Sequence, residues 1–473
     1  MFASRVIRLS ISAFLAVLLV VGCKGHGSSS SSQIPQSLTN WVWESGSESA
    51  NSPGSYETQG TASVTSQPSG RYGAMSWIDS TGQFWIFSGA GGVNDMWAFN
   101  TGTLQWTWER GGNGLSGAVA GTYPASPNLP ASATNLPGQR NSAATWVDKT
   151  GNLWMFGGYG TDSNGLIGYM NDMWSFSPST KWWAWIGGSA SAGALAGNPN
   201  WGTLGVADPA NQPNPRSNAA TWTDAAGNFY MYGGNGYLNS GTYIQGDLWQ
   251  YNPVANLWTW INGSQSPTAI GSYGSIGVTV AANKPGARHS ATTWTSSDGG
   301  TFWLYGGTGV DANGTLGDLN DLWKYDVQSN MWTWVSGSNL VNATGVYGTN
   351  EVLAATNQPG ARYGATGWVG KDGNLWLFGG NGINSTGTPV VLNDLWEYQT
   401  ATNQWVWFNG SYNGNSPGFY GTLNTLSSSN IPGSRIYSSN WVDSAGVFWL
   451  YGGQGFDASS TNGRLGDLWK YTP

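Results

Sequence analysis

An arginine recurs at six nearly regular positions, and this repeat constrains the fold more than any other feature of the chain. The intervals between successive arginines are 69, 76, 72, 74 and 73 residues, and a tryptophan follows each arginine by six positions. The arginines are Arg71, Arg140, Arg216, Arg288, Arg362 and Arg435. Self-similarity at a fixed period indicates one supersecondary unit used many times. The chain is therefore expected to stack six similar repeats, numbered here 1 to 6 from Arg71.

Each repeat carries four strand signals. In repeat 2 the arginine strand is followed by "NLWMFGG" (152–158), then by "NDMW" (171–174), then by Trp-x-Trp (183–185). Aromatic residues two positions apart lie on one face of a strand. The chain has 72 Gly and 31 Trp and only 9% charged residues, a composition that disfavours long helices. The sequence therefore predicts an all-β fold built from four-stranded antiparallel sheets.

The two ends of the repeat array complement each other. Repeat 6 stops before its Trp-x-Trp, while Trp41-Val42-Trp43 stands ahead of repeat 1. A single sheet of this kind would leave aromatic side chains in water, and burial of each is worth roughly 1.5–3 kcal/mol. Radial stacking lets every sheet cover its neighbour. We predict a six-bladed β-propeller of four-stranded antiparallel blades, with the N-terminal strand completing the last blade.

These features resemble kelch repeats, and the resemblance covers residues 38–473. The kelch superfamily includes galactose oxidase-like copper enzymes, which need two histidine ligands, tyrosine ligands and a Tyr–Cys crosslink. This sequence offers only His26, His289 and Cys23, so copper chemistry is excluded on ligand count. Sialidases share a turn motif that "SSDGGTFW" (296–303) fits once, but no Glu stands out as a catalytic candidate. Without these ligands and catalytic residues, the sequence favours a binding protein over an enzyme. The alternative is a sugar-active enzyme of the kelch kind, mutarotase- or epimerase-like or a diverged oxidase without copper.

The first 37 residues are expected to serve export and attachment. Two arginines and a short apolar run predict a signal peptide over 1–22. The segment ends in "VVGC" (20–23), which resembles the lipobox of bacterial lipoproteins and implies lipidation of Cys23, the only cysteine. Residues 23–37 read as a flexible tether ahead of the propeller over 38–473. We therefore expect an extracytoplasmic location, with contact to a membrane through the lipid alone. Where the cell has an outer membrane, we expect the anchor to lie there.

Loop lengths indicate a functional face. Long inserts join the fourth strand of one repeat to the first of the next, whereas the turns from first to second strand are short. The connection from second to third strand spans 12 or 13 residues in repeats 2 to 6, but only five between Gly89 and Asp95 in repeat 1. Antiparallel order places both kinds of long connection on one face. Binding residues concentrate on loops held by a rigid scaffold, so this face is expected to bind the ligand.

Two kinds of residue are candidates for that site. The six arginines could hold a carboxylate or sulfate, although an aspartate recurs in register with them and favours a structural Arg–Asp pair instead. The residues after the arginines vary, and Tyr72, His289 and Tyr363 are the candidates among them. The loops "DSNG" (162–165) and "DANG" (311–314) have the oxygen ligands of calcium loops, but Asn-Gly also forms hairpin turns. We expect no other cofactor, a carbohydrate or protein ligand, and a monomer. The formal net charge of −7 argues against nucleic-acid binding.

Overall fold

The computed structural model describes residues 41–114, 118–193, 197, 199–238 and 241–473. The chain divides into residues 1–38 and 39–473. The predicted signal peptide, Cys23 and the tether lie outside the described residues. Within the described ranges the regular secondary structure consists of β-strands, without an α-helix, as the composition predicted. The same residues contain no helix long and apolar enough to span a membrane.

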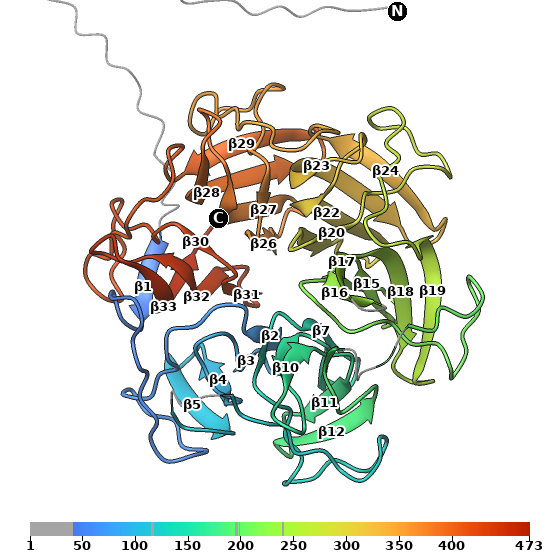
Figure 1. Ribbon diagram of the computed structural model, residues 1–473. Helices are drawn as coiled ribbons and strands as arrows, with labels where there is room; N and C mark the ends of the chain where they lie inside the picture. The colour runs from blue at the N-terminus through green and yellow to red at the C-terminus, as the bar shows by residue number, and fades with distance from the viewer. Residues whose placement is uncertain (1–40, 115–117, 194–196, 198, 239–240) are drawn as a thin grey trace, which may run out of the picture. The chain divides into compact units, whose positions relative to one another are not determined.

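The strands form a series of antiparallel sheets, and each main sheet corresponds to one sequence repeat (Figure 1). Repeat 1 contains β2 (Met75–Ile78), β3 (Phe84–Phe87), β4 (Met96–Asn100) and β5 (Gln105–Arg110). Repeat 2 contains β7 (Ala144–Val147), β8 (Leu153–Phe156), β11 (Met173–Ser177) and β12 (Trp182–Gly187), with a small sheet of β6 (Arg140–Asn141), β9 (Tyr159–Thr161) and β10 (Ile167–Tyr169). Repeat 3 contains β14 (Ala220–Thr223), β15 (Phe229–Tyr232), β18 (Gly246–Asn252) and β19 (Leu257–Ser264), with a small sheet of β13 (Arg216–Ser217), β16 (Asn235–Leu238) and β17 (Gly241–Ile244).

In repeats 4 to 6 the small sheet merges with the main one. Repeat 4 contains β20 (Arg288–His289), β21 (Thr292–Thr295), β22 (Thr301–Val310), β23 (Leu316–Asp326) and β24 (Met331–Ser336). Repeat 5 contains β25 (Arg362–Tyr363), β26 (Thr366–Val369), β27 (Leu375–Ile383), β28 (Pro389–Gln399) and β29 (Gln404–Asn409). Repeat 6 contains β30 (Arg435–Ile436), β31 (Ser439–Val442), β32 (Phe448–Phe456) and β33 (Asn462–Tyr471), and its outermost strand is β1 (Trp41–Ser45).

Strand β1 therefore joins the two ends of the repeat array. It runs antiparallel to β33, with Trp41 opposite Tyr471 and Trp43 opposite Trp469. The Trp41 ring is fully buried, 5.0 Å from the Tyr471 ring and 5.2 Å from the ring of Phe378 in the preceding repeat. The aromatic burial that the sequence analysis required is met here by side chains from opposite ends of the chain.

Neighbouring sheets are fastened by the tryptophans of the inner strands. The contacts β2–β7, β7–β14, β14–β21, β21–β26, β26–β31 and β31–β2 form a closed cycle. The Trp77 indole N–H donates to the Trp154 carbonyl of the next repeat at 3.0 Å, and the contact recurs in the following repeats. Between the last and first repeats, Trp441 stacks on Phe84 with ring centroids 4.9 Å apart. The core therefore lies between the sheets.

A cycle of backbone hydrogen bonds, here called the backbone circle, closes around the centre. One residue per repeat donates its N–H to the carbonyl of its counterpart in the preceding repeat, at 2.8–2.9 Å, and repeat 1 donates to repeat 6. The six residues are Gly73, Ser142, Asn218, Ser290, Gly364 and Tyr437, all with φ between 54° and 64°. The sequence analysis expected one continuous first strand. The left-handed residue instead divides it into two pieces, which turns the N–H and carbonyl toward the neighbouring repeats.

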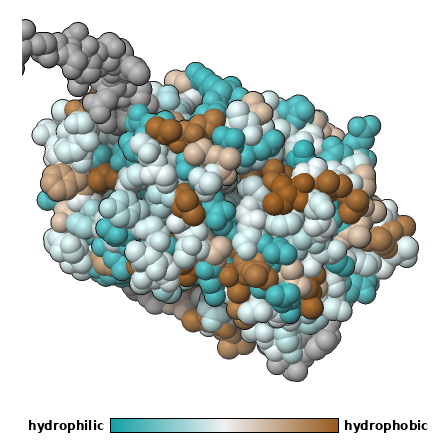
Figure 2. Space-filling model, turned by 90° about the horizontal axis from the view of Figure 1, so that it is seen from above, coloured by the Kyte–Doolittle hydropathy of each residue, from teal (hydrophilic) through white to brown (hydrophobic). Residues whose placement is uncertain are grey.

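The long inserts between repeats have a role that loop length did not reveal. Each insert runs along the outer strand of the repeat that follows it, and donates a backbone N–H to the carbonyl of the second tryptophan in that strand. The pairs are Gly60–Trp108, Asn128–Trp185, Gly205–Trp260, Gly277–Trp334, Glu351–Trp407 and Asn424–Trp43, at 2.8–2.9 Å. An uncovered outer strand would offer unpaired backbone groups to other chains. The inserts therefore cover sheet edges. On the side shown in Figure 2, hydrophobic side chains lie in separate groups among polar ones.

The connections from second to third strand are largely hairpins. In repeat 4, β22 and β23 continue beyond the main sheet to a turn at Asp311–Thr315, and repeats 5 and 6 do the same. Repeats 2 and 3 build their hairpins as the separate sheets β9–β10 and β16–β17. Repeat 1 has no hairpin here, and Tyr72 pairs only with Ala90 through an isolated bridge. This difference shapes the candidate site.

Candidate functional site

The six predicted arginines lie inside the sheets, and one of them, Arg140, also lines a cavity that is described below. Each guanidinium is at most 1% exposed and forms two hydrogen bonds to the aspartate of its own repeat, at 2.6–2.8 Å. The pairs are Arg71–Asp95, Arg140–Asp172, Arg216–Asp247, Arg288–Asp321, Arg362–Asp394 and Arg435–Asp467. The Arg71 donors are all used within the protein, because Ser69 and Ser88 accept the remaining three hydrogen bonds. This geometry favours the structural role over ligand binding.

The aspartates hold further donors. In repeat 1 the Oδ2 atom of Asp95 accepts hydrogen bonds from the Trp97 indole and the Tyr56 hydroxyl, both at 2.7 Å. The tyrosine belongs to the insert before the repeat and recurs in every repeat except repeat 3, where Trp201 replaces it. Burial alone lowers the pKa of Arg71, but attraction to Asp95 more than offsets this, so the pKa is raised and the charge persists. The network ties each insert to its sheet.

The predicted residues Tyr72, His289 and Tyr363 are brought together by a residue that the sequence analysis missed. The ring of Tyr437 lies 6.3 Å from that of Tyr72 and 6.2 Å from that of Tyr363. Its hydroxyl is 3.0 Å from Ser290 Oγ, which is 2.9 Å from His289 Nδ1. Residues of four repeats, 1, 4, 5 and 6, thus share one aromatic and polar cluster. Tyr437 could have been noticed because its position holds Gly, Ser or Asn in the other five repeats.

Burial sets the chemistry of this cluster. It lowers the pKa of His289 to about 4 and raises the pKa of Tyr437 to about 12, so both groups are neutral at pH 7. The cluster borders a cavity of about 180 Å³, here called the central cavity, lined by residues from all six repeats. Tyr437 supplies its one aromatic wall. A neutral imidazole and phenol can exchange hydrogen bonds with a polar ligand, but a general base is expected to have a pKa nearer the working pH.

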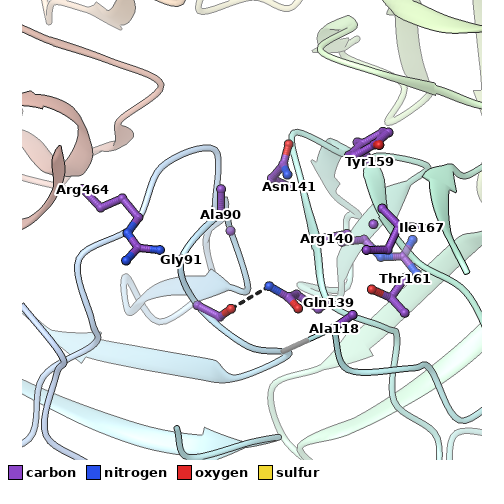
Figure 3. A pocket seen from close by; sticks show the side chains of 13 residues that line it. Ala90, Gly91, Ala118, Gln139, Arg140, Asn141, Tyr159, Thr161, Ile167 and Arg464 are labelled. Atoms are coloured by element: carbon purple, nitrogen blue, oxygen red, sulfur yellow. Dashed lines mark hydrogen bonds between the residues drawn. The ribbon is translucent and has the colours of Figure 1, made fainter. Parts of the chain in front are cut away.

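A second cavity, of about 370 Å³, lies where repeat 1 lacks its hairpin and is here called the repeat 1 cavity (Figure 3). Its walls come from the short connection of repeat 1, from the first strand and hairpin of repeat 2, and from β33 of repeat 6. The lining includes Gly91, Gln139, Asn141, Tyr159, Ile167 and Arg464. Its volume lies in the range typical of small-molecule sites. This cavity thus lies at the place where repeat 1 departs from the other five.

The polar groups of the repeat 1 cavity differ in how they are held. The Gln139 amide donates to the Gly92 carbonyl at 2.8 Å and is fixed (Figure 3). Within the described ranges, the side chains of Asn141, Tyr159 and Arg464 have no hydrogen-bond or ion-pair partner. Tyr159 is 41% exposed, and its ring packs edge-on against Tyr169 at 5.1 Å. Free amide, phenol and guanidinium groups thus face a cavity beside an exposed aromatic ring.

The two candidate calcium loops use their carboxylates within the protein. Oδ1 of Asp162 accepts the backbone N–H groups of Asn164 and Leu166, and its Oδ2 accepts that of Ala192. Asp311 is bound in the same way. Across the described residues no three His, Cys, Asp or Glu side chains cluster as a metal site would require. The arrangement explains both loops as hairpin turns that also hold the neighbouring insert.

Comparison with known proteins adds evidence on the fold. No family model matches the sequence, and no curated protein matches it. Among solved structures, "Structure of YjhT" aligns with a TM-score of 0.51 and 15% sequence identity, over 85% of this chain and 95% of that one. At this identity the likeness speaks for the fold alone. The chain is an all-β protein of small antiparallel sheets arranged like the blades of a propeller.

Proposed function

We propose that residues 38–473 form a six-bladed kelch propeller whose N-terminal strand completes the last blade. Three observations support this architecture. The main sheets coincide with the six repeats, the inner strands contact one another in a closed cycle, and β1 pairs with β33. The backbone circle adds six hydrogen bonds that only a closed cycle of repeats can make.

We propose that this propeller is a binding module that takes a carbohydrate in the repeat 1 cavity. The observation that carries the proposal is the loss of one hairpin, which opens a cavity lined by free polar groups and an exposed tyrosine. Sugars present hydroxyl groups together with apolar ring faces, so amide donors beside an aromatic ring suit them. The predicted lipid on Cys23 would hold the module outside the cytoplasm, and detection of a lipidated Cys23 by mass spectrometry tests that part.

The binding proposal is tested on a glycan array with the purified chain. Tyr159→Ala and Asn141→Ala each remove a group from the cavity wall, and we expect each to weaken carbohydrate binding about tenfold. Tyr412→Ala is the matched control, because Tyr412 is similarly exposed, at 47%, and does not line the cavity. Equal binding by the Tyr159 and Tyr412 variants would place the site elsewhere. A silent array combined with capture of a specific protein would favour the protein-ligand alternative.

One observation favours the alternative of a sugar-active enzyme. The His289–Ser290–Tyr437 cluster joins three polar groups beside the central cavity. Mutarotation, epimerisation and oxidation assays on common sugars, with His289→Gln as the comparison, test it. Turnover that depends on His289 would replace the binding proposal. Because the imidazole pKa is about 4, activity of this kind would have to use neutral His289 at pH 7.

A further inference from the structure

Arg464 is the one arginine of the described residues whose guanidinium has no partner. The six arginines of the repeats are paired with aspartates, and Arg110 donates to the backbone carbonyls of Lys181 and Ala133. The Arg464 side chain has no hydrogen bond or ion pair, although the residue is half-buried. Its charge is available to a ligand.

The surrounding backbone fits this side chain. A Cβ at Gly91 would lie 2.3 Å from Arg464 Cδ and 2.8 Å from Nε, so only glycine lets the guanidinium lie against the short connection of repeat 1. Gly91 also has φ of +95°, which other residues rarely adopt. The Arg464 backbone is held by Asn51 through hydrogen bonds of its N–H at 3.1 Å and its carbonyl at 2.6 Å. Both sides of the contact are therefore fixed.

The position of Arg464 makes it part of the repeat 1 cavity. It comes from β33 of repeat 6 and lines the cavity with Asn141 and Tyr159 of repeat 2 (Figure 3). No carboxylate is among the lining residues that the structure describes, so nothing within the cavity neutralises the charge. A guanidinium presents a planar fork of donors that matches an oxyanion, and partial burial strengthens the attraction because water screens it less.

We propose that the saccharide bound in the repeat 1 cavity is acidic, and that Arg464 binds its oxyanion. The oxyanion is a carboxylate, as in a uronate, or a sulfate ester. Asn141 and Tyr159 then contact the hydroxyl groups and the ring of the same sugar. This inference rests on the proposed function, because it names the class of carbohydrate that the cavity takes.

The experiment compares matched probes on one array. Oligogalacturonides carry carboxylates, their methyl esters have the same backbone without charge, and sulfated galactans with their desulfated forms provide the second pair. We expect the full chain to bind one acidic probe at least tenfold more tightly than its neutral match. Arg464→Gln should lower binding of the acidic probe to the level of the neutral one, and Arg464→Lys should retain part of it. The probe pair in which the acidic member binds more tightly shows whether the oxyanion is a carboxylate or a sulfate ester.

Two further variants control for charge and folding. Lys284→Gln removes an exposed cation that does not line the cavity, and it should leave binding unchanged. Gly91→Ala keeps every charge but displaces the guanidinium, and it should weaken acidic probes at least fivefold. A thermal melt shows that each variant is folded. Binding of acidic probes that is equal in the wild type and Arg464→Gln would overturn the inference. Binding of neutral and acidic probes alike would also overturn it and leave the proposed function standing, whereas a silent array would overturn both.

Discussion

Substitution of Asp394 by Asn tests whether the arginine column is structural. The Asp394 carboxylate is fully buried and accepts hydrogen bonds from both Nη atoms of Arg362, at 2.7 and 2.8 Å, and from Tyr347 and Trp396, each at 2.7 Å. The amide keeps the shape but removes the negative charge, so the Arg362 charge stays buried without compensation. Breaking a buried pair in this way costs about 3–5 kcal/mol.

The expected change in melting temperature follows from the size of the unit. Unfolding entropy is about 2.1 cal/mol/K per residue, which gives about 0.9 kcal/mol/K for residues 39–473. A loss of 3–5 kcal/mol therefore lowers the melting temperature by about 3–6 °C. Differential scanning calorimetry measures this shift directly, and the ratio of calorimetric to van't Hoff enthalpy shows whether the unit still unfolds as one.

The matched control is Glu109→Gln, which removes the same charge from a partly exposed ion pair. Glu109 accepts a hydrogen bond from Lys181 at 2.8 Å, and the Lys181 side chain is 36% exposed. Pairs of this kind contribute about 0–1 kcal/mol, so the melting temperature should fall by about 1 °C or less. If Asp394→Asn lowers the melting temperature no more than Glu109→Gln does, the six Arg–Asp pairs do not stabilise the fold as proposed. Binding of a ligand by these arginines would then be the better explanation.

Three other predictions concern closure, the central cluster and pH. Trp41→Ala should destabilise the whole unit by about 3–5 kcal/mol in calorimetry. Trp182, which is 40% exposed, is the control, and Trp182→Ala should cost less than about 1 kcal/mol. An unchanged main transition in Trp41→Ala would contradict closure by β1. Tyr437→Phe should lower the free energy of unfolding in urea by about 1 kcal/mol, because it removes the hydrogen bond to Ser290. The same substitution in a Ser290→Ala background should then change the free energy of unfolding by nearly nothing. Additive losses would exclude this coupling. The pKa of His289 is lowered to about 4 in the folded protein, so the unfolded chain takes up the proton first as the pH falls. The free energy of unfolding should therefore decrease by about 3 kcal/mol between pH 6.5 and pH 4. His289→Gln should remove this part of the pH dependence, and an identical slope in both proteins would show that the imidazole is accessible.

The sequence predicted the repeated structure well because it is written in side chains. Tryptophan spacing located the four strands of each repeat. The position of Trp41-Val42-Trp43 ahead of repeat 1 predicted that this segment pairs with the last strand, β33. The tryptophans and the Arg–Asp pairs recur because each repeat packs against its neighbours through the same side chains. Such contacts appear in the sequence as periodic hydrophobic positions.

Features that depend on the backbone were harder to predict. The left-handed residue inside each first strand is Gly, Ser, Asn or Tyr, so no residue type marks the backbone circle. Loop length showed that the inserts are long, but it could not show that they run along strand edges, because backbone hydrogen bonds carry no sequence signature. Arg464 was overlooked because it lies outside the repeated column. The short connection of repeat 1 was visible, yet its consequence, a cavity shared by three repeats, needed the folded chain.

The pairing of β1 with β33 also has a consequence for the time course of folding. About 420 residues separate the two strands, so β1 cannot reach its partner until nearly the whole unit has left the ribosome. At about 5–20 residues per second, that delay is on the order of 20–90 s. During this interval an early strand carrying two tryptophans has no native neighbour, and the incomplete chain leaves aromatic surface open at both ends. The ten residues of β33 therefore decide when the aromatic side chains of β1 can be covered by their native partner.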